Sequence, residues 1–121
     1  MLGIGIDAVD IARFRGSLER TPKMRTRLFT PEELESLAAA ADPVPSLAAR
    51  FAVREAVMKA MGVGLGAFDF HDVSVERMET GAPRLRVTGR ALDLARSKGI
   101  SDWHVSITHT DGVAMAVVAA V

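Results

Sequence analysis

Four charged side chains lie close together in one alanine-rich stretch, and their spacing suggests chemistry on a charged ligand. Arg50 and Arg54 are four residues apart, and so are Glu55 and Lys59. In a helix, each of these pairs shares one stripe of the surface. The stretch is apolar nearly all round, so a helix here has little exposed surface for four charges. Buried charges need oppositely charged partners, a metal ion or an anionic ligand.

The spacing of Glu55 and Lys59 also has a purely structural interpretation. An acid four residues before a base is the favoured order for a helix ion pair, which contributes roughly 0.2–0.5 kcal/mol. Spacing alone favours this structural pair, since many charge networks have no functional role. The apolar surroundings favour a ligand site instead, and both interpretations stay open at this point.

Asp7 supplies a further carboxylate near the N-terminus. Gly3, Gly5 and Asp7 alternate with apolar residues, which predicts a strand whose glycine face is approached closely by a ligand or another backbone. Alone, Asp7 could equally cap a turn or the next helix. Together with Glu55 it could hold Mg²⁺, which takes one or two protein carboxylates and completes its octahedron with phosphates and water. Lys59 would then reach a phosphate oxygen, as suits a phosphate ester.

The composition excludes several other kinds of site. The chain has no cysteine and only three histidines, which excludes thiolate chemistry and makes a histidine-rich zinc site improbable. His109, on the apolar face of a predicted strand, would more often be a core histidine than a ligand. No P-loop, nucleophile elbow or dinucleotide fingerprint is present. The residues 62–66 are rich in glycine but follow a helix, so they are a weak phosphate cradle.

Charge is balanced overall and uneven along the chain. Fifteen basic and fifteen acidic side chains give a net charge of zero, which argues against a nucleic-acid-binding protein. No apolar run reaches the roughly 20 residues of a membrane span, and no signal peptide is evident, so we expect a cytoplasmic protein. Residues 11–30 hold six cations and one anion, which predicts a basic patch for an acidic partner. The basic patch consists of Arg13, Arg15, Arg20, Lys23, Arg25 and Arg27.

The pattern of elements predicts a single domain over residues 1–121, of α+β class, with an antiparallel sheet packed against helices. Asp10, Thr30 and Ser46 are the expected N-caps of the first three helices, and Gly62 ends the third. The expected strands are residues 2–7, 73–75, 84–87, 103–110 and 113–121; the expected helices are residues 11–21, 31–41, 47–61 and 88–98.

Three motifs, in order along the whole chain, resemble the holo-[acyl-carrier-protein] synthase family of short bacterial-type phosphopantetheinyl transferases. They are GIGID at residues 3–7, RFAVREAVMKAMG at residues 50–62, and SITHT at residues 106–110. The turn and strand at residues 81–85 are also similar. The resemblance implies transfer of the 4′-phosphopantetheine arm of coenzyme A to a serine of apo acyl carrier protein. Adenosine 3′,5′-bisphosphate is released, and the reaction serves fatty acid biosynthesis.

The resemblance also implies roles for individual residues. Asp7 and Glu55 match the family's Mg²⁺ ligands, and Lys59 matches the lysine that contacts the phosphates of the coenzyme. His109, with Thr110 beside it, matches the position by the nucleotide and its ribose phosphate. Arg50 matches the arginine near that position.

Partner contacts and assembly are implied in the same way. The basic first helix, with Arg13 and Arg20, matches the surface that receives the acidic carrier protein. Short members of the family form homotrimers with shared active sites, so we expect a homotrimer. Many members have lysine where this chain has Arg54, so the role of Arg54 stays open. A docking module without catalysis and a structural oligomer with buried ion pairs are the alternatives.

Overall fold

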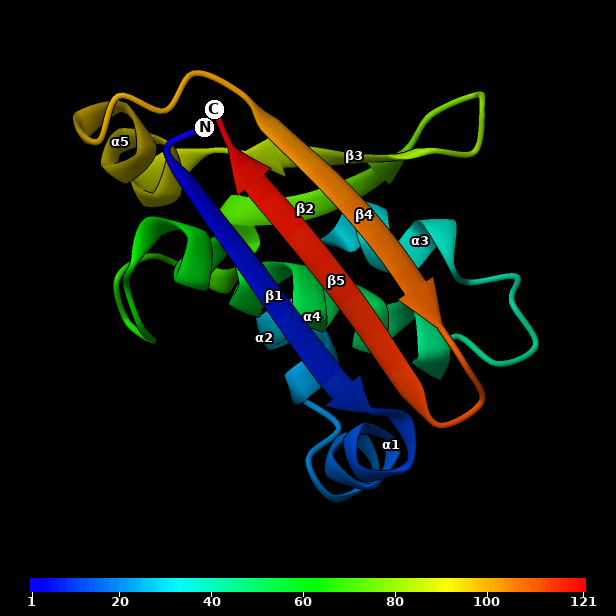
Figure 1. The fold of residues 1–121 in the computed structure, drawn as a ribbon. Coiled ribbons are helices and arrows are strands. Elements are labelled where there is room, and N and C mark those ends of the chain that lie inside the picture. Colours follow the sequence, from blue (N-terminus) through cyan, green and yellow to red (C-terminus); the bar gives the residue numbers. More distant parts are fainter.

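Five antiparallel strands form two sheets, and one long helix crosses the larger of them. The computed structural model describes residues 1–121. The larger sheet has the order β1–β5–β4, and the strands are β1 (Gly3–Asp10), β5 (Val113–Ala120) and β4 (Trp103–His109). The strands β2 (Val73–Arg77) and β3 (Pro83–Val87) form a separate hairpin, and β3 contacts β4. The two chain ends lie side by side at one end of the larger sheet (Figure 1).

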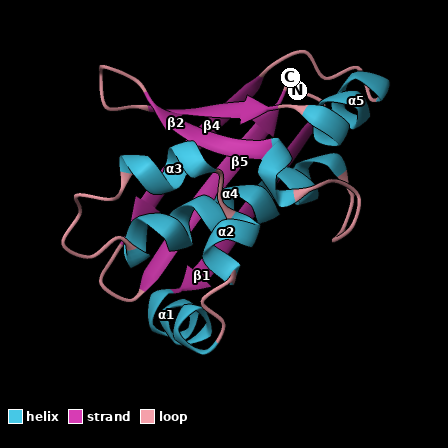
Figure 2. Ribbon diagram, turned by 180° about the vertical axis from the view of Figure 1, so that it is seen from behind, coloured by secondary structure: helices cyan, strands magenta, loops and turns pink.

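The helices gather on one side of the larger sheet. The long helix is α4 (Val44–Met61), and Figure 2 shows it with α2 and α3 over the inner face of the sheet. The remaining helices are α1 (Ile11–Arg20), α2 (Met24–Leu28), α3 (Pro31–Ser36) and α5 (Gly89–Ser97), with one 3₁₀ turn, η1 (Phe70–Asp72). The predicted α+β class is therefore confirmed. None of the helices is both long enough and apolar enough to span a membrane.

The glycine face of β1 is where α4 approaches most closely. A Cβ atom at Gly5 would meet the Ala56 carbonyl oxygen at 1.9 Å, and one at Gly3 would meet the Ala60 carbonyl oxygen at 2.0 Å. No side chain fits between these two backbones. The close approach expected from the alternating glycines is thus made by α4, and it sets the distance between Asp7 on β1 and Glu55 on α4.

We expect Gly5→Ala to destabilise the protein, because the added methyl group must push β1 away from α4. Forced overpacking of this kind costs about 1–3 kcal/mol or more. Gly64→Ala is the matched control, since a Cβ there meets nothing within 4 Å. Urea denaturation of both variants tests this. A Gly5→Ala protein as stable as Gly64→Ala would contradict the close packing.

The outer face of the larger sheet is uncovered and apolar at β1. Leu2, Ile4 and Ile6 are 58%, 61% and 57% exposed, and Met115 on the neighbouring β5 is also exposed. Figure 1 looks onto this face, and no helix covers it. Exposed apolar surface of this extent on a sheet is typical of an interaction site.

Several local expectations about caps are confirmed. The Asp10 carboxylate accepts a hydrogen bond from the Arg13 amide at 2.9 Å, which caps α1. Thr30 and Glu33 form a capping box at the start of α3, and Gly62 ends α4 with a left-handed φ of 70°.

Other expected boundaries are wrong. The α3 helix ends at Ser36 rather than near residue 41, because the following alanines are exposed and bury no apolar stripe. The α4 helix begins at Val44, so Ser46 is not its cap. Asp42 serves the first turn instead, since its carboxylate accepts from the Val44 amide at 3.2 Å. The short α2 and η1 were not expected; neither is long enough to show a period in the sequence.

Candidate active site

Lys59 pairs with Asp7 across the contact between α4 and β1. Its ammonium nitrogen lies 3.1 Å from the Asp7 Oδ1 and donates to the Ile6 carbonyl oxygen at 2.9 Å. No ion pair joins Lys59 to Glu55, so the structural pair suggested by their spacing does not form. The lysine is instead drawn to the strand, where it stands beside the carboxylate with more than half of its side chain exposed.

Glu55 is half-buried beside Asp7 and has no hydrogen-bond partner of its own in the fold. Burial raises the pKa of Glu55, the Asp7 charge raises it further, and Lys59 opposes the shift. Both carboxylates line a cavity of about 440 Å³ with Asp10, Arg13 and Phe51. The two carboxylates repel each other at the mouth of this cavity, and a cation bound between them would remove that repulsion.

The donor set at this mouth fits a hard divalent cation. Asp7 and Glu55 supply carboxylate oxygens from two elements that the glycine contact holds together. The structure contains no group of three or more histidine, aspartate or glutamate side chains suited to a metal ion. A cation at Asp7 and Glu55 would therefore take its other ligands from water and substrate, which is the usual way that Mg²⁺ binds.

The raised pKa of Glu55 predicts a pH dependence of stability in metal-free protein. The native state holds the Glu55 proton more tightly than the unfolded chain does, so the unfolding free energy falls as the pH rises from the ordinary glutamate pKa through the raised value. Glu55→Gln removes the charge and should abolish this fall. The test is thermal denaturation of both proteins in the presence of a chelator. The pH runs from about 4 to 8, the range in which such shifts act. Parallel curves for the two proteins would contradict it.

Arg50 and His109 meet in a second cavity, on the other side of α4. This cavity of about 210 Å³ is also lined by Ser46, Arg77 and Pro83, and so includes the turn between β2 and β3. Burial lowers the pKa of Arg50, and its Nη1 is the one buried side-chain nitrogen or oxygen without a hydrogen-bond partner. A cavity lined by two arginines and a histidine, with Glu76 as its one acidic residue, suits a phosphate group.

The two cavities share no lining residue. The residues expected to serve one reaction therefore fall into two groups: Asp7, Glu55 and Lys59 at the junction of β1 and α4, and Arg50 with His109 beside the β2–β3 hairpin. Within one chain, the structure brings together the members of each group but not the two groups.

The other expected site residues are placed as follows. Arg13 lines the cavity of Asp7 and Glu55, and Arg20 is exposed at the end of α1. The Thr110 hydroxyl accepts from the Gly112 and Val113 amides at 3.3 and 3.2 Å, so it closes the β4–β5 turn and lines neither cavity.

Arg54 is a structural residue in this fold. Its side chain is fully buried, bonds both carboxylate oxygens of Glu33 at 2.5 and 3.2 Å, and donates to the Phe70 carbonyl oxygen at 2.9 Å. Its guanidinium carbon lies 5.0 Å from the centre of the Phe29 ring. The planar fork that distinguishes arginine from lysine is thus fully used in joining α4 to α3 and η1.

Sequence reasoning missed two residues near Arg50. Glu33 was visible only as a capping residue, although its carboxylate is buried between two arginines. Arg77 lines the cavity of Arg50 and His109, and the one available signal was its position just before the glycine–proline turn.

The α+β fold carries paired carboxylates, a lysine and a separate cavity lined by arginines, a set of groups that suits a phosphate ester as substrate. The family model described as "4'-phosphopantetheinyl transferase superfamily" matches residues 3–118, and the chain therefore belongs to this superfamily. Over 120 residues, the chain is 48% identical to a holo-[acyl-carrier-protein] synthase of Streptomyces avermitilis, covering 99% of this chain and 97% of that protein.

Two solved structures carry the same similarity. The holo-[acyl-carrier-protein] synthase of Neisseria meningitidis aligns with a TM-score of 0.91 and 31% identity, covering 99% of this chain and 98% of that one. The Helicobacter pylori holo-[acyl-carrier-protein] synthase in complex with coenzyme A aligns with a TM-score of 0.84 and 32% identity, covering 98% and 99%. The family resemblance of the three sequence motifs is confirmed.

Proposed function

We propose that this chain transfers the 4′-phosphopantetheine arm of coenzyme A to a serine hydroxyl of apo acyl carrier protein and releases adenosine 3′,5′-bisphosphate. Membership of the transferase superfamily and whole-length similarity to holo-[acyl-carrier-protein] synthases support this reaction. The observation that carries it is that Asp7 and Glu55 line one cavity while Asp7 also pairs with Lys59. In this proposal the enzyme is cytoplasmic and serves fatty acid biosynthesis.

The residues at the junction of β1 and α4 have distinct roles in the proposal. Asp7 and Glu55 hold Mg²⁺, which when bound supplies a positive charge that stabilises the transferred phosphoryl group. Lys59, already aligned by Asp7 and the Ile6 carbonyl, neutralises charge on the phosphate oxygens. The serine oxygen attacks the pantetheine-bearing phosphorus in line, and the proton of its hydroxyl is released to solvent. The phosphoanhydride bond breaks, and its electrons leave with adenosine 3′,5′-bisphosphate.

The most direct test of the reaction uses apo acyl carrier protein, coenzyme A and Mg²⁺, followed by intact mass measurement of the carrier. We expect the carrier to gain one phosphopantetheine. A carrier of unchanged mass, with folded enzyme and a carrier that a known transferase modifies, would eliminate the proposal and leave a docking module or a structural oligomer.

The basic patch supports docking of an acidic carrier protein beside the active site. Arg13 lines the cavity of Asp7 and Glu55 from α1, which places a cation of the patch next to the reacting groups. Arg15 is engaged with Asp42 through two hydrogen bonds of 3.0 and 2.7 Å and holds the pKa of Asp42 below its usual range. Arg13 and Arg20 are exposed cations available to a partner.

A homotrimer with shared sites accounts for the separation of the two cavities. Coenzyme A must reach both the metal-binding pair and the Arg50–His109 cavity. In a trimer, one chain can provide Asp7 and Glu55 while its neighbour provides the Arg50–His109 cavity of the same active site. The apolar outer face at Leu2, Ile4 and Ile6 is the surface that such an assembly would bury. Closed rings are the usual way for identical chains to bury such a face.

We expect two inactive variants to restore activity when combined. Glu55→Gln damages the metal-binding residues of an active site, and His109→Ala damages its nucleotide-binding residues. In a mixed trimer, some interfaces take the metal-binding residues from the His109→Ala chain and the nucleotide-binding residues from the Glu55→Gln chain, so both are intact. About one quarter of the sites recover if subunits mix at random around a closed ring. Co-expression with two different tags, followed by a transfer assay at low coenzyme A, measures the recovery. Verified mixed oligomers without any recovered activity would exclude shared sites.

A further inference from the structure

A buried cluster of two arginines and one glutamate lies behind the Arg50–His109 cavity. Glu33 on α3 stands between Arg50 and Arg54 on α4, and all three side chains are at least nine-tenths buried. One carboxylate therefore serves two guanidinium groups, so the cluster has one excess positive charge in a region where charge is poorly solvated. Buried charge of this kind requires a partner from outside the cluster.

The hydrogen bonds show which arginine is left with the excess charge. The Glu33 Oε1 accepts from the Arg54 Nη2 and the Thr30 amide, and its Oε2 accepts from the Arg54 Nη1 and the Val75 amide. These bonds use most of the lone pairs of the carboxylate. Arg50 keeps only a 3.9 Å contact from its Nε to the Glu33 Oε2.

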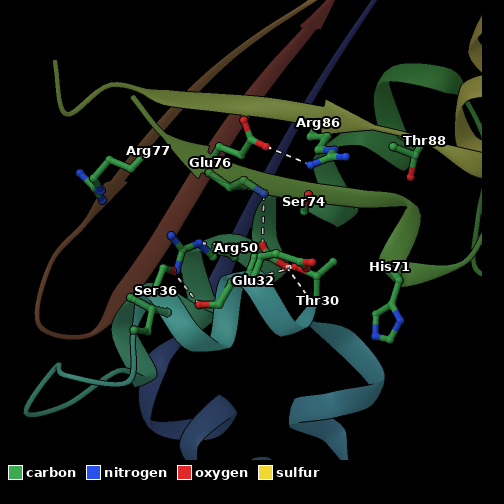
Figure 3. A pocket seen from close by; sticks show the side chains of 13 residues that line it. Thr30, Glu32, Ser36, Arg50, His71, Ser74, Glu76, Arg77, Arg86 and Thr88 are labelled. Carbon is green, nitrogen blue, oxygen red and sulfur yellow. Dashed lines mark hydrogen bonds and ion pairs between the residues drawn. The ribbon is translucent and has the colours of Figure 1, made fainter. Parts of the chain in front are cut away.

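The Arg50 guanidinium is consequently attracted to Glu33 at its Nε edge, while its terminal nitrogens have no hydrogen-bond partner in the fold. Its Nη1 is buried without a hydrogen-bond partner, and no hydrogen bond within the fold holds any other atom of its guanidinium group. The side chain lies at the junction of two cavities, the one with His109 and a larger one of about 550 Å³ between α3 and the β2–β3 hairpin. Figure 3 looks into the larger cavity, with Arg50 and Glu76 on its walls.

We propose that Glu33 is a positioning residue for substrate binding: occupied by Arg54, it fixes the guanidinium of Arg50 without hydrogen-bonding it, so that this guanidinium, on the wall of both cavities, is available to a phosphate group of coenzyme A. This inference rests on the proposed function, since it assumes that Arg50 contacts the coenzyme. Arg54 has the supporting part, because its two bonds occupy both Glu33 oxygens and leave Arg50 with an ion pair at 3.9 Å and no hydrogen bond. Neither Glu33 nor Arg54 touches the substrate.

The test separates positioning from folding. Glu33→Gln alone leaves two buried arginines without a counter-charge and can fail to fold, so the main variant is E33Q/R54M, which replaces the buried ion pair by neutral groups of similar size. Steady-state kinetics of this variant are measured against coenzyme A. We expect KM to rise about tenfold, as for loss of one well-placed ionic contact, with kcat nearly unchanged. R90M is the control, because Arg90 is exposed on α5 and bonds only the Gly66 carbonyl oxygen.

A second variant covers the case in which E33Q/R54M does not fold. R54K keeps the charge, but a single ammonium cannot occupy both oxygens of Glu33, so Arg50 can pair with the oxygen released and turn away from the cavity. We expect a KM for coenzyme A several-fold above that of the wild type at an unchanged kcat. The inference is overturned if E33Q/R54M or R54K folds and has the same KM for coenzyme A as the wild type. If the wild-type enzyme itself transfers nothing, the proposed function fails instead, and calorimetry of coenzyme A binding to the same variants still tests the positioning role.

Discussion

Glu55→Gln should reduce the rate of phosphopantetheine transfer by several orders of magnitude while leaving the protein at least as stable as the wild type. Phosphoryl transfer depends heavily on positioning and on charge stabilisation by bound cations. The amide keeps the shape of the side chain but is a poor ligand for Mg²⁺. Since burial and Asp7 both raise the pKa of Glu55, the charged form is disfavoured in the fold, and removing the charge relieves that penalty.

Opposite changes in rate and stability make this prediction specific. A residue kept only for a structural ion pair would lower stability when changed and would leave kcat nearly intact. The measurement combines single-turnover transfer at saturating Mg²⁺ with urea denaturation, using Glu79→Gln as the matched control at an exposed position of the β2–β3 turn. Wild-type turnover by Glu55→Gln would rule out its role as a metal ligand.

Arg54→Met should lower the free energy of unfolding more than Gly5→Ala or Glu55→Gln does. The substitution leaves the buried Glu33 carboxylate with Arg50, at 3.9 Å, as its one remaining cationic neighbour and removes the bond to the Phe70 carbonyl oxygen. Removal of one partner from a buried ion pair costs about 3–5 kcal/mol, because the remaining charge is not compensated.

The double variant E33Q/R54M identifies the source of that loss. Replacing the whole pair by neutral groups is often close to neutral, so it should recover much of the stability that Arg54→Met loses. Denaturation is measured at one protein concentration, since association of chains alters apparent stability. An Arg54→Met protein within about 1 kcal/mol of the wild type, the range of an ordinary surface pair, would show that the Arg54–Glu33 pair contributes little.

The sequence was most informative where a local pattern has a direct physical consequence. The alternation of Gly3 and Gly5 with apolar residues predicted a close backbone approach, and α4 makes it. The capping box at Thr30 and Glu33 was readable because it depends on residues three apart. The two stripes of α4 separate Arg50 and Arg54 from Glu55 and Lys59 as helix geometry requires.

Contacts between distant segments could not be predicted in the same way. Lys59 had a partner available at i−4 and pairs instead with Asp7 on β1, because the packing of α4 on the glycine face brings that carboxylate within reach. The sequence around Glu33 indicated only a capping residue. Its burial depends on contacts with Arg54 on α4 and Val75 on β2, which are distant in the sequence. The end of α3 was misjudged because alanine propensity alone does not maintain a helix that buries nothing.

Equilibrium binding of Mn²⁺ in the presence of coenzyme A, followed by electron paramagnetic resonance, tests the central claim most directly. Mn²⁺ accepts the same oxygen ligands as Mg²⁺ and reports its own coordination. We predict one tightly held ion per site in the wild-type protein and loss of that signal in both Asp7→Asn and Glu55→Gln, with coenzyme A binding retained through the Arg50–His109 cavity. An unchanged Mn²⁺ signal in either folded variant would contradict the assignment of these two carboxylates as the metal ligands.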